Sequence, residues 1–416
     1  MNEMVKMLPQ MLSGQELMER MAEYPAYTEG IKERSSAERL IALSDVYDLY
    51  IPSQMSVEIY HKLYMGILRS LQKKESMQAV RQQYENGRGI RGKRYQGIIG
   101  GSDSFTIIGS SGIGKSSAVY RAISLITEKE VIEIEQPYCK IAPCIVVQCP
   151  FDCSVKGLLL EILRRVDEVL DSHYYTQAVR ARATTDMLVG SVSQVALNHI
   201  GLLVVDEIQN VANSKNGKSL VGMLTQLINN SGISICMVGT PESIPFFEQA
   251  MQLARRSLGL QYGPLEFGKG FCEVCSRIFT YQYTKEGMEL TEGVLEWLYE
   301  HCSGNLSILV AIFHDAQETA ILEGRDILDM QALEMAYQTR MSMLHDYLEP
   351  YADKKKQCST KRKRKAASAM GAEQKDTRDE AAGEYTLEEL VKKTKAEGRD
   401  IVEVLKEYLP VEEVAV

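Results

Sequence analysis

Residues 109–116 constrain the fold of this chain more than any other segment. They read Gly-Ser-Ser-Gly-Ile-Gly-Lys-Ser and match the pattern G-x-x-x-x-G-K-[ST] in full. The apolar, β-branched run 105–108 precedes them, and a helix-favouring stretch, 117–123, follows. A strand, a loop and a helix in this order form the setting in which such a loop binds phosphate groups. The sequence therefore predicts an α/β protein that binds a nucleoside triphosphate.

Each type of residue in this phosphate loop has its own predicted role. The glycines let the backbone wrap closely and direct its N–H groups at phosphate oxygens. The lysine is expected to reach the β- and γ-phosphates, and the serine after it to ligate Mg²⁺. The N-terminal end of the next helix adds positive partial charge. The predicted nucleotide-binding residues here are Gly109, Ser110, Ser111, Gly112, Ile113, Gly114, Lys115, Ser116 and Ser117.

A second motif follows the apolar run 201–205. The run does not alternate with polar residues, which predicts a central parallel strand covered on both faces. Ligands bind at the carboxyl ends of strands in an open α/β sheet. Asp206 is therefore expected to hold Mg²⁺ together with Ser116, and Glu207 to act as the general base for an attacking water. A strand that ends in a solvated acidic turn is the alternative, which the phosphate loop disfavours.

A third predicted strand, 233–238, leads into Gly-Thr-Pro-Glu at 239–242. Thr240 is the candidate for contact with the γ-phosphate or the attacking water. A threonine that only caps the turn before Pro241 is an equally open interpretation. A further buried strand is predicted at 144–149.

Composition narrows the class of protein. The 416 residues leave room for two to three domains, and the hydrophobic content of 45% is ordinary for a globular protein. No apolar run approaches the roughly 20 residues that span a membrane, and no signal-peptide pattern is present, so we expect a cytoplasmic protein. The nine cysteines look like reduced thiols; Cys272 and Cys275 lack a second pair at metal spacing, so zinc is not expected. The net charge of −9 argues against an indiscriminate nucleic-acid coat but allows a local basic face.

Five segments follow from changes in composition and periodicity. A mostly helical N-terminal extension precedes the α/β core, apolar positions at helical spacing predict a helical lid after it, and a basic, polar linker and an amphipathic tail close the chain. Their predicted bounds are 1–75, 76–265, 266–347, 348–383 and 384–416.

A phosphate-loop core followed by a helical lid is the layout of the AAA+ ATPases. Three segments narrow the resemblance: Asp-Glu-Ile-Gln-Asn at 206–210, Val-Gly-Thr-Pro-Glu at 238–242 and Leu-Ala-Arg-Arg at 253–256. Over residues 50–345 the chain resembles the TnsC/TniB family, the ATP-dependent regulators of Tn7-like and related transposons. The resemblance implies an AAA+ core, with a parallel sheet covered by helices on both faces, together with the lid and the N-terminal extension.

The resemblance also implies a function. Proteins of this family assemble with ATP and Mg²⁺ as rings or helical filaments on double-stranded DNA, and they link a target selector to the transposase; hydrolysis promotes disassembly. The preference for adenine comes from the family alone. Arg255 and Arg256 lie where AAA+ proteins place the arginine that reaches a neighbouring subunit's γ-phosphate, and Arg256 is favoured. Two solvated helix charges are the alternative.

The family contacts the DNA backbone from the region after the second core strand. The matching candidates in this sequence are Lys156, Thr176, Arg180 and Arg182, in a region that also holds Arg164 and Arg165. Contacts of this kind give salt-sensitive and sequence-tolerant binding. No zinc finger or clear recognition helix is evident, so base-specific reading is not expected.

One departure from the AAA+ pattern affects the lid. Many lids offer an arginine from a Gly-x-x-Arg turn, but here Gly304 is followed by Ser307 at the arginine position. We expect Gly304 and Asn305 to set a close backbone approach, and the missing cation predicts a slow or partner-stimulated ATPase.

Several alternatives stay open. The basic run 354–365 is either a DNA-contacting or solubilising linker or a patch that resembles a nuclear localisation signal by coincidence. The tail either docks a partner such as the transposase or folds back on the lid. A replication loader or initiator shares the nucleotide chemistry, and a signalling NTPase switch would not bind duplex DNA. A small-molecule kinase is least favoured, because the lid is C-terminal and Glu207 stands beside Asp206.

Overall fold

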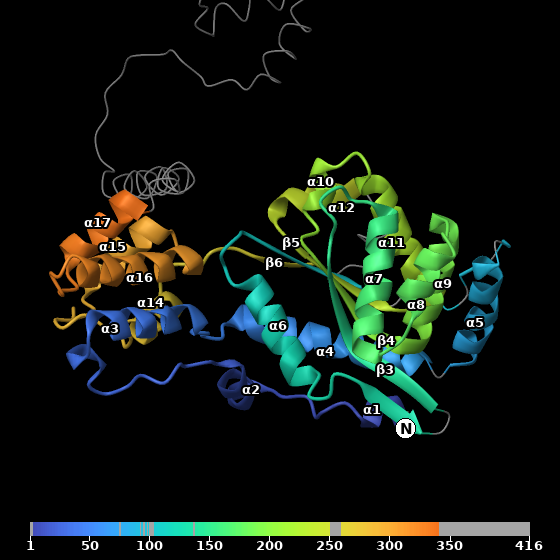
Figure 1. Ribbon diagram of the computed structural model, residues 1–416, viewed down its shortest axis with the longest axis horizontal. Coiled ribbons are helices and arrows are strands. Elements are labelled where there is room, and N and C mark those ends of the chain that lie inside the picture. Colours follow the sequence, from blue (N-terminus) through green and yellow to red (C-terminus); the bar gives the residue numbers. More distant parts are fainter. Residues whose placement is uncertain are drawn as a thin grey trace, which may run out of the picture. The chain divides into compact units, whose positions relative to one another are not determined.

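The computed structural model describes residues 3–74, 76–91, 93–94, 96–97, 99, 104–135, 138–249 and 259–340 (Figure 1). The chain divides into one unit from Met1 to Lys354 and a second from Lys355 to Val416, and the described residues all belong to the first. The predicted linker, its basic runs and the amphipathic tail therefore lie outside the described residues. None of the described helices has the length and apolarity needed to cross a bilayer.

The described core is built on a six-stranded sheet with the order β2-β3-β4-β5-β1-β6. β2 is antiparallel to β3, and the other neighbours are parallel. Because β1, β4 and β5 are parallel neighbours, the loops that follow them meet at the carboxyl edge of the sheet. The strands are β1 (Phe105–Gly109), β2 (Ile132–Glu135), β3 (Tyr138–Gln148), β4 (Ile200–Asp206), β5 (Ser234–Gly239) and β6 (Leu260–Tyr262).

The predicted strands are present, and one is longer than predicted. β3 begins at Tyr138 rather than at 144, because its first half pairs with the short strand β2. Only its second half pairs in parallel with β4. The apolar run gave no sign of this antiparallel extension.

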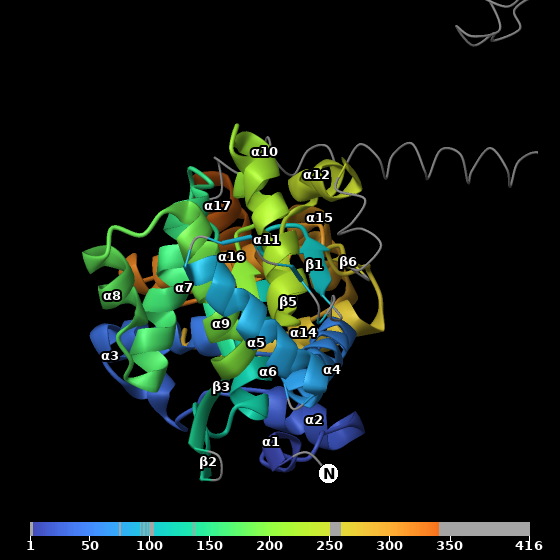
Figure 2. The ribbon, with the colours of Figure 1, turned by 90° about the vertical axis from the view of Figure 1, so that its right-hand side faces the viewer.

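Helices cover both faces of the sheet (Figures 1 and 2). Along β4, Leu203 and Val205 point into one apolar cluster, while Leu202 and Val204 point into the other. The sheet is therefore buried on both sides, which explains its non-alternating sequence. This confirms the predicted α/β core, a mostly parallel sheet with helices on both faces. One face packs against α7 (Val155–Leu170), α9 (Thr185–His199) and α11 (Gly217–Ser231); the other packs against α1 (Glu3–Lys6), α2 (Gly14–Met21), α4 (Gln54–Lys74) and α6 (Lys115–Ile126).

The predicted helical lid has an apolar core of its own. It contains α14 (Lys269–Ile278), α15 (Glu292–Cys302), α16 (Leu306–Leu322) and α17 (Met330–Arg340). The remaining described helices are η1 (Ile31–Glu33), α3 (Ser36–Leu43), η2 (Ser44–Asp48), α5 (Met77–Ile90), α8 (Tyr174–Arg180), α10 (Asn210–Asn213), η3 (Pro241–Ser243) and α12 (Ile244–Gln249).

The N-terminal segment is shared between the two cores. Its helices α2 and α4 pack on the sheet, whereas Leu43 of α3 and Val46 of η2 are buried in the lid core. The segment between them, around Ile51, therefore passes from the lid to the sheet.

A buried ion pair fixes α3 to the lid. The Arg39 side chain is 1% exposed, donates to Asp326 Oδ2 over 2.9 Å and also donates to the Tyr283 carbonyl over 3.1 Å. The hydrogen bond from Arg39 holds the pKa of Asp326 below its usual value. Removing Arg39 would leave Asp326, which is 15% exposed, with the exposed Lys285 at 3.5 Å as its remaining described cationic partner, and would remove the buried guanidinium that joins α3 to the lid.

We therefore predict that Arg39→Ala destabilises the lid by about 3 kcal/mol. Trp297, in α15, is the one tryptophan of the chain, so its fluorescence during urea unfolding reports on the lid. Arg34→Ala is the matched control, because Arg34 is 53% exposed in its pair with Glu38 and such pairs contribute at most about 1 kcal/mol. Equal losses in the two variants would contradict the assignment.

Candidate nucleotide-binding site

The phosphate loop joins β1 to α6 as predicted. Gly112 and Gly114 have φ angles of +79° and +89°, in the left-handed region that favours glycine. A side chain at Gly109 would meet the Tyr262 carbonyl oxygen at 2.8 Å. The loop conformation therefore depends on these glycines, and α6 begins directly at Lys115.

The Lys115 ammonium lies inside the loop. It donates to the carbonyl oxygens of Gly109 and Ser110 over 2.6 and 2.7 Å, and the residue is 8% exposed. Burial lowers the pKa of Lys115, and the nearby Asp206 carboxylate opposes this shift. Neutral carbonyl groups are its direct hydrogen-bond partners, so the loop suits an anionic ligand.

The two residues predicted to hold Mg²⁺ come together. Ser116 Oγ lies 3.3 Å from Asp206 Oδ2, and the second oxygen of Asp206 accepts from the Glu207 amide over 2.8 Å. Asp206 is 9% exposed at the end of β4. A hydroxyl and a carboxylate oxygen at this spacing are hard donors of the kind that Mg²⁺ requires.

Gln209 connects the predicted general base to the next strand. Its amide nitrogen donates to the Glu207 carboxylate, and its amide oxygen accepts from the Thr240 N–H over 3.3 Å. A side chain at Gly239 would meet this oxygen at 2.8 Å, so the glycine leaves room for the bridge. Glu207 itself has a φ of +57°, a strained conformation for glutamate. The sequence motif contained Gln209 but gave it no role.

Thr240 lies at the tip of β5, beside the cavity described below. Its hydroxyl donates to the Glu242 carboxylate, and this hydrogen bond lowers the pKa of Glu242. Its role in contacting a γ-phosphate stays a prediction.

The lid turn contacts the phosphate loop directly. Asn305 Nδ2 donates to the Ser111 carbonyl over 2.9 Å, and the Ser307 amide donates to the Gly112 carbonyl over 3.0 Å. Gly304 has a φ of +76°, so the expected close approach is present. The lid thus reaches the loop through neutral groups.

A cavity of about 440 Å³ adjoins the loop. The cavity has an apolar wall that the sequence analysis did not predict. The residues of this wall come from both the N-terminal segment and the lid. They have no common local signal, because the wall exists only after the N-terminal segment packs into the lid core. They are Tyr47, Leu49, Tyr50, Ile51, Met55, Val274, Ile278, Leu306 and Val310.

The predicted DNA contacts occupy two places. Lys156 is exposed in the first turn of α7, where the Ser154 side chain caps the helix. Thr176 and Arg180 lie on α8, and the exposed Arg182 follows that helix. α8 comes after the far end of α7, and the sixteen residues of α7 span about 24 Å.

The other arginines named in the sequence analysis either form ion pairs or lie outside the described residues. Arg164 forms ion pairs with Glu161 and Glu168, and Arg165 pairs with Glu168. The candidate fingers Arg255 and Arg256 lie outside the described residues.

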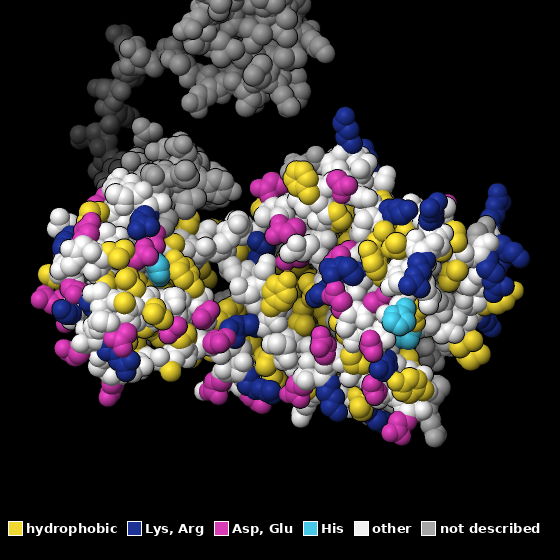
Figure 3. Space-filling view, viewed as in Figure 1, with side chains coloured by type: hydrophobic (Ala, Val, Ile, Leu, Met, Phe, Trp, Pro, Cys, Tyr) yellow, Lys and Arg dark blue, Asp and Glu magenta, His cyan; other side chains and the backbone are white. Residues whose placement is uncertain are grey.

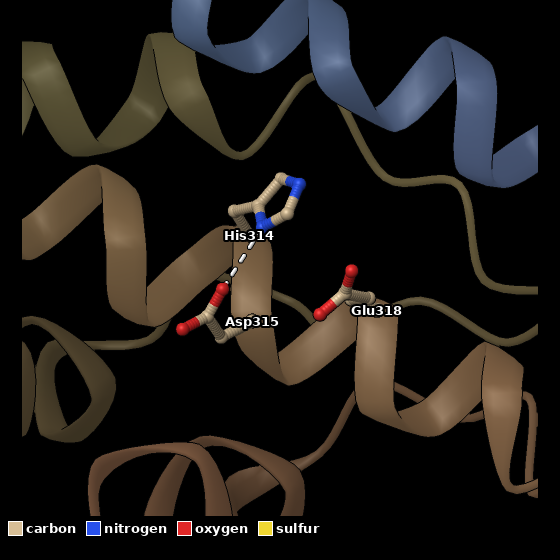
Figure 4. Close-up of side chains that lie close together, drawn as sticks. All are labelled: His314, Asp315 and Glu318. Carbon is tan, nitrogen blue, oxygen red and sulfur yellow. Dashed lines mark hydrogen bonds and ion pairs between the residues drawn. The ribbon is translucent and has the colours of Figure 1, made fainter. Parts of the chain in front are cut away.

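A separate cluster of His314, Asp315 and Glu318 lies on α16 of the lid (Figure 4). His314 Nδ1 is 3.0 Å from Asp315 Oδ1, while Glu318 pairs with Arg340 over 3.2 Å. None of the three side chains lines the nucleotide cavity.

Contact between the lid and the loop leads to a prediction for Gly112. A methyl group there would meet Asn305 Oδ1 at 2.5 Å, and the left-handed backbone would be strained. We expect Gly112→Ala to weaken nucleotide binding at least tenfold in a titration with a fluorescent ATP analogue. Gly222→Ala, in the middle of α11 with open space around it, is expected to leave binding unchanged. Equal binding by both variants would contradict the proposed lid contact.

Comparison with known proteins finds a family model that matches part of the core. Residues 101–260 match the model of the family described as bacterial TniB protein. A search of curated proteins finds no relative. Similar solved structures include Orc1 of Aeropyrum pernix in complex with DNA (12% identity, TM-score 0.41, 63% of this chain and 64% of that one) and Cdc6p of Pyrobaculum aerophilum (11%, 0.39, 64% and 68%). A Walker-type ATPase of Pyrococcus abyssi matches at 12% identity and a TM-score of 0.39, over 79% and 88%. The match thus spans just under two thirds of the Orc1 chain.

Proposed function

We propose, from the premise that the core of this chain belongs to the TniB family, that the protein is an AAA+ ATPase regulating DNA transposition. In this proposal it oligomerises on double-stranded DNA with ATP and Mg²⁺ and links a target selector to the transposase. It would act in the cytoplasm, associated with DNA. The observation that carries the nucleotide part is the meeting of Lys115, Ser116 and Asp206 at one edge of the sheet.

The nucleotide would enter with its phosphates in the loop and its base in the apolar cavity. Backbone amides of residues 112–116 would bind phosphate oxygens, and Lys115 would exchange its carbonyl partners for them. Bound through Ser116 and Asp206, Mg²⁺ would neutralise charge on the β- and γ-phosphates. The flat base would lie against Ile51 and the lid residue Ile278, while adenine preference rests on the family alone.

Hydrolysis would use Glu207 as the base. Its carboxylate would take a proton from the attacking water, and Gln209 would hold that carboxylate in place. Thr240 would contact the γ-phosphate or the water. Arg256 or Arg255 of a neighbouring subunit would supply the remaining positive charge, so turnover would depend on assembly and would lead to disassembly.

DNA would be bound through its phosphates rather than its bases. Lys156 is exposed and free of an ion pair with the described residues, which supports a role in backbone contact. Thr176, Arg180 and Arg182 would extend the contact along α8. Binding of this kind is strongly salt-dependent.

We predict that Glu207→Gln lowers kcat for phosphate release at least 100-fold, as expected for loss of a general base, while nucleotide affinity is retained.

Gln209→Ala is expected to lower kcat about tenfold with KM unchanged, because the base is held less firmly while phosphate binding is intact. Gln338→Ala, exposed on α17, is the control. A rise in KM alone for Gln209→Ala would show that Gln209 binds nucleotide instead.

The DNA part is tested by co-sedimentation with duplex DNA and electron microscopy. We expect particles or filaments on DNA with a slowly hydrolysed ATP analogue, and none with ADP or without nucleotide. Nucleotide binding without DNA association in any state would contradict the proposal and indicate a switch directed at proteins.

A further inference from the structure

We propose that the outward side of α5 binds an acidic amphipathic helix of a partner protein. The binding surface consists of Met77, Val80, Arg81 and Tyr84 on the helix and of Arg91 at its C-terminal cap, and we call it the α5 outer face. The inference goes beyond the proposed function, because none of these residues lines the nucleotide cavity or belongs to the predicted DNA contacts.

The side chains of α5 are arranged in the reverse of the usual pattern. Three large apolar side chains are exposed: Met77 by 74%, Val80 by 58% and Tyr84 by 70%. Two amide side chains of the same helix, Gln82 and Asn86, are completely buried. A surface helix normally turns its apolar stripe toward the core, so an apolar stripe on the outside marks a contact surface for another molecule.

Hydrogen bonds of the buried amides fix which side of α5 points outward. Gln82 Nε2 donates to Asn86 Oδ1 over 3.0 Å, and Asn86 Nδ2 donates to the Asn230 carbonyl of α11 over 3.0 Å. The Ile99 amide donates to Gln82 Oε1 over 3.1 Å. Rotating α5 to bury its apolar stripe would break these buried hydrogen bonds, which is costly. The stripe therefore stays available to a partner.

The spacing of the stripe suits a helical partner. Met77, Val80 and Tyr84 stand at positions i, i+3 and i+7, so they follow one side of the helix over two turns. A partner helix can pack its own apolar stripe along such a row. α5 lies at an outer edge of the core in Figure 1 and faces the viewer in Figure 2.

The charge around the stripe selects an acidic partner. Segment 76–97 contains five basic residues and one acidic residue, Glu85, which pairs with Arg88 over 3.1 Å. Dark blue side chains project in Figure 3 at the edge of the core where Figure 1 shows α5. Four of the basic side chains are exposed and form no ion pair with a described residue: Arg81, Arg91, Lys93 and Arg94.

These cations also distinguish between the possible occupants. They would repel the same face of a second copy, so self-association through this surface is disfavoured. Duplex DNA would attract the cations, but its phosphates need hydrogen-bond donors or positive charge, and Met77 and Val80 offer neither. A helix that carries Glu and Asp beside an apolar stripe complements both features of the α5 outer face.

The test uses three labelled synthetic helices with the same leucine spacing and with Glu, Gln or Lys at the other exposed positions. Their affinity for the full chain is measured by fluorescence anisotropy at low salt. We expect the Glu peptide to bind at least tenfold more tightly than the Lys peptide, with the Gln peptide between them. Val80→Ala/Tyr84→Ala should weaken binding of the Glu peptide about tenfold or more, because apolar contact area is lost.

A second variant tests the charge. Arg81→Gln/Arg91→Gln should reduce the difference in affinity between the Glu and Gln peptides, because two cations of the surface are removed. Two control variants should bind all three peptides as the wild-type chain does. They are Ile41→Ala, an exposed apolar side chain on α3, and Lys269→Gln, an exposed lysine on α14. Unchanged nucleotide affinity in every variant is the expected sign that the fold is intact.

Three results would overturn the inference. Absence of binding by the Glu peptide, or equal binding of the Glu and Lys peptides, rules out the acidic partner. Full affinity of Val80→Ala/Tyr84→Ala for the Glu peptide shows that the contact lies elsewhere. Loss of duplex DNA affinity in Arg81→Gln/Arg91→Gln, with peptide binding unchanged, assigns the face to nucleic acid instead. The proposed function is independent of these results, because its tests measure nucleotide turnover and assembly on DNA.

Discussion

Two hydrogen bonds from the lid to the phosphate loop connect the helical lid to the α/β core. Asn305 and Ser307 donate to the carbonyls of Ser111 and Gly112, two residues of the predicted phosphate-binding loop. The same Asn305 caps α16 through its side-chain oxygen. Asn305 therefore connects the start of α16, the longest of the described lid helices, to the phosphate loop, so a ligand that moved the loop would also act on the lid.

The N-terminal segment makes a second connection. Arg39 and Leu43 fasten it to the lid, and α4 fastens it to the sheet, so the stretch around Ile51 crosses the cavity wall. A base in the cavity would contact both the N-terminal segment, at Ile51, and the lid, at Ile278. In the proposed function, lid position and nucleotide occupancy would thereby be coupled through packed apolar side chains as well as through the hydrogen bonds of the loop.

Local patterns made the centre of the site predictable from the sequence. The loop glycines, Lys115 and the apolar run before Asp206 each have a cause within about ten residues, and the structure brings their functional groups together. The apolar wall and the division of the N-terminal segment depend on contacts between distant segments, which periodicity does not report. Gln209 escaped prediction for another reason: a glutamine after a strand has many possible partners, and only the fold places Glu207 and the Thr240 amide on either side of it. The roles of Arg255 and Arg256 stay predictions.

The charges around the cavity bear on how turnover would be controlled. Among the described residues that line it, Lys115 is the one cation, and Asp206 and Glu207 are both anionic. Asn305 approaches the loop as a neutral donor to carbonyl oxygens, so the lid adds no positive charge where an arginine is common. A triphosphate carries more negative charge than one lysine and one Mg²⁺ neutralise, and the transition state spreads that charge over the γ-phosphate oxygens. In the proposed function, backbone N–H groups and the N-terminal end of α6 would offset part of this charge, and a further cation would come from outside the described cavity. In the proposed function, a guanidinium from a neighbouring subunit would meet this need only after assembly, and for that reason we expect an isolated subunit to bind the nucleotide but hydrolyse it slowly.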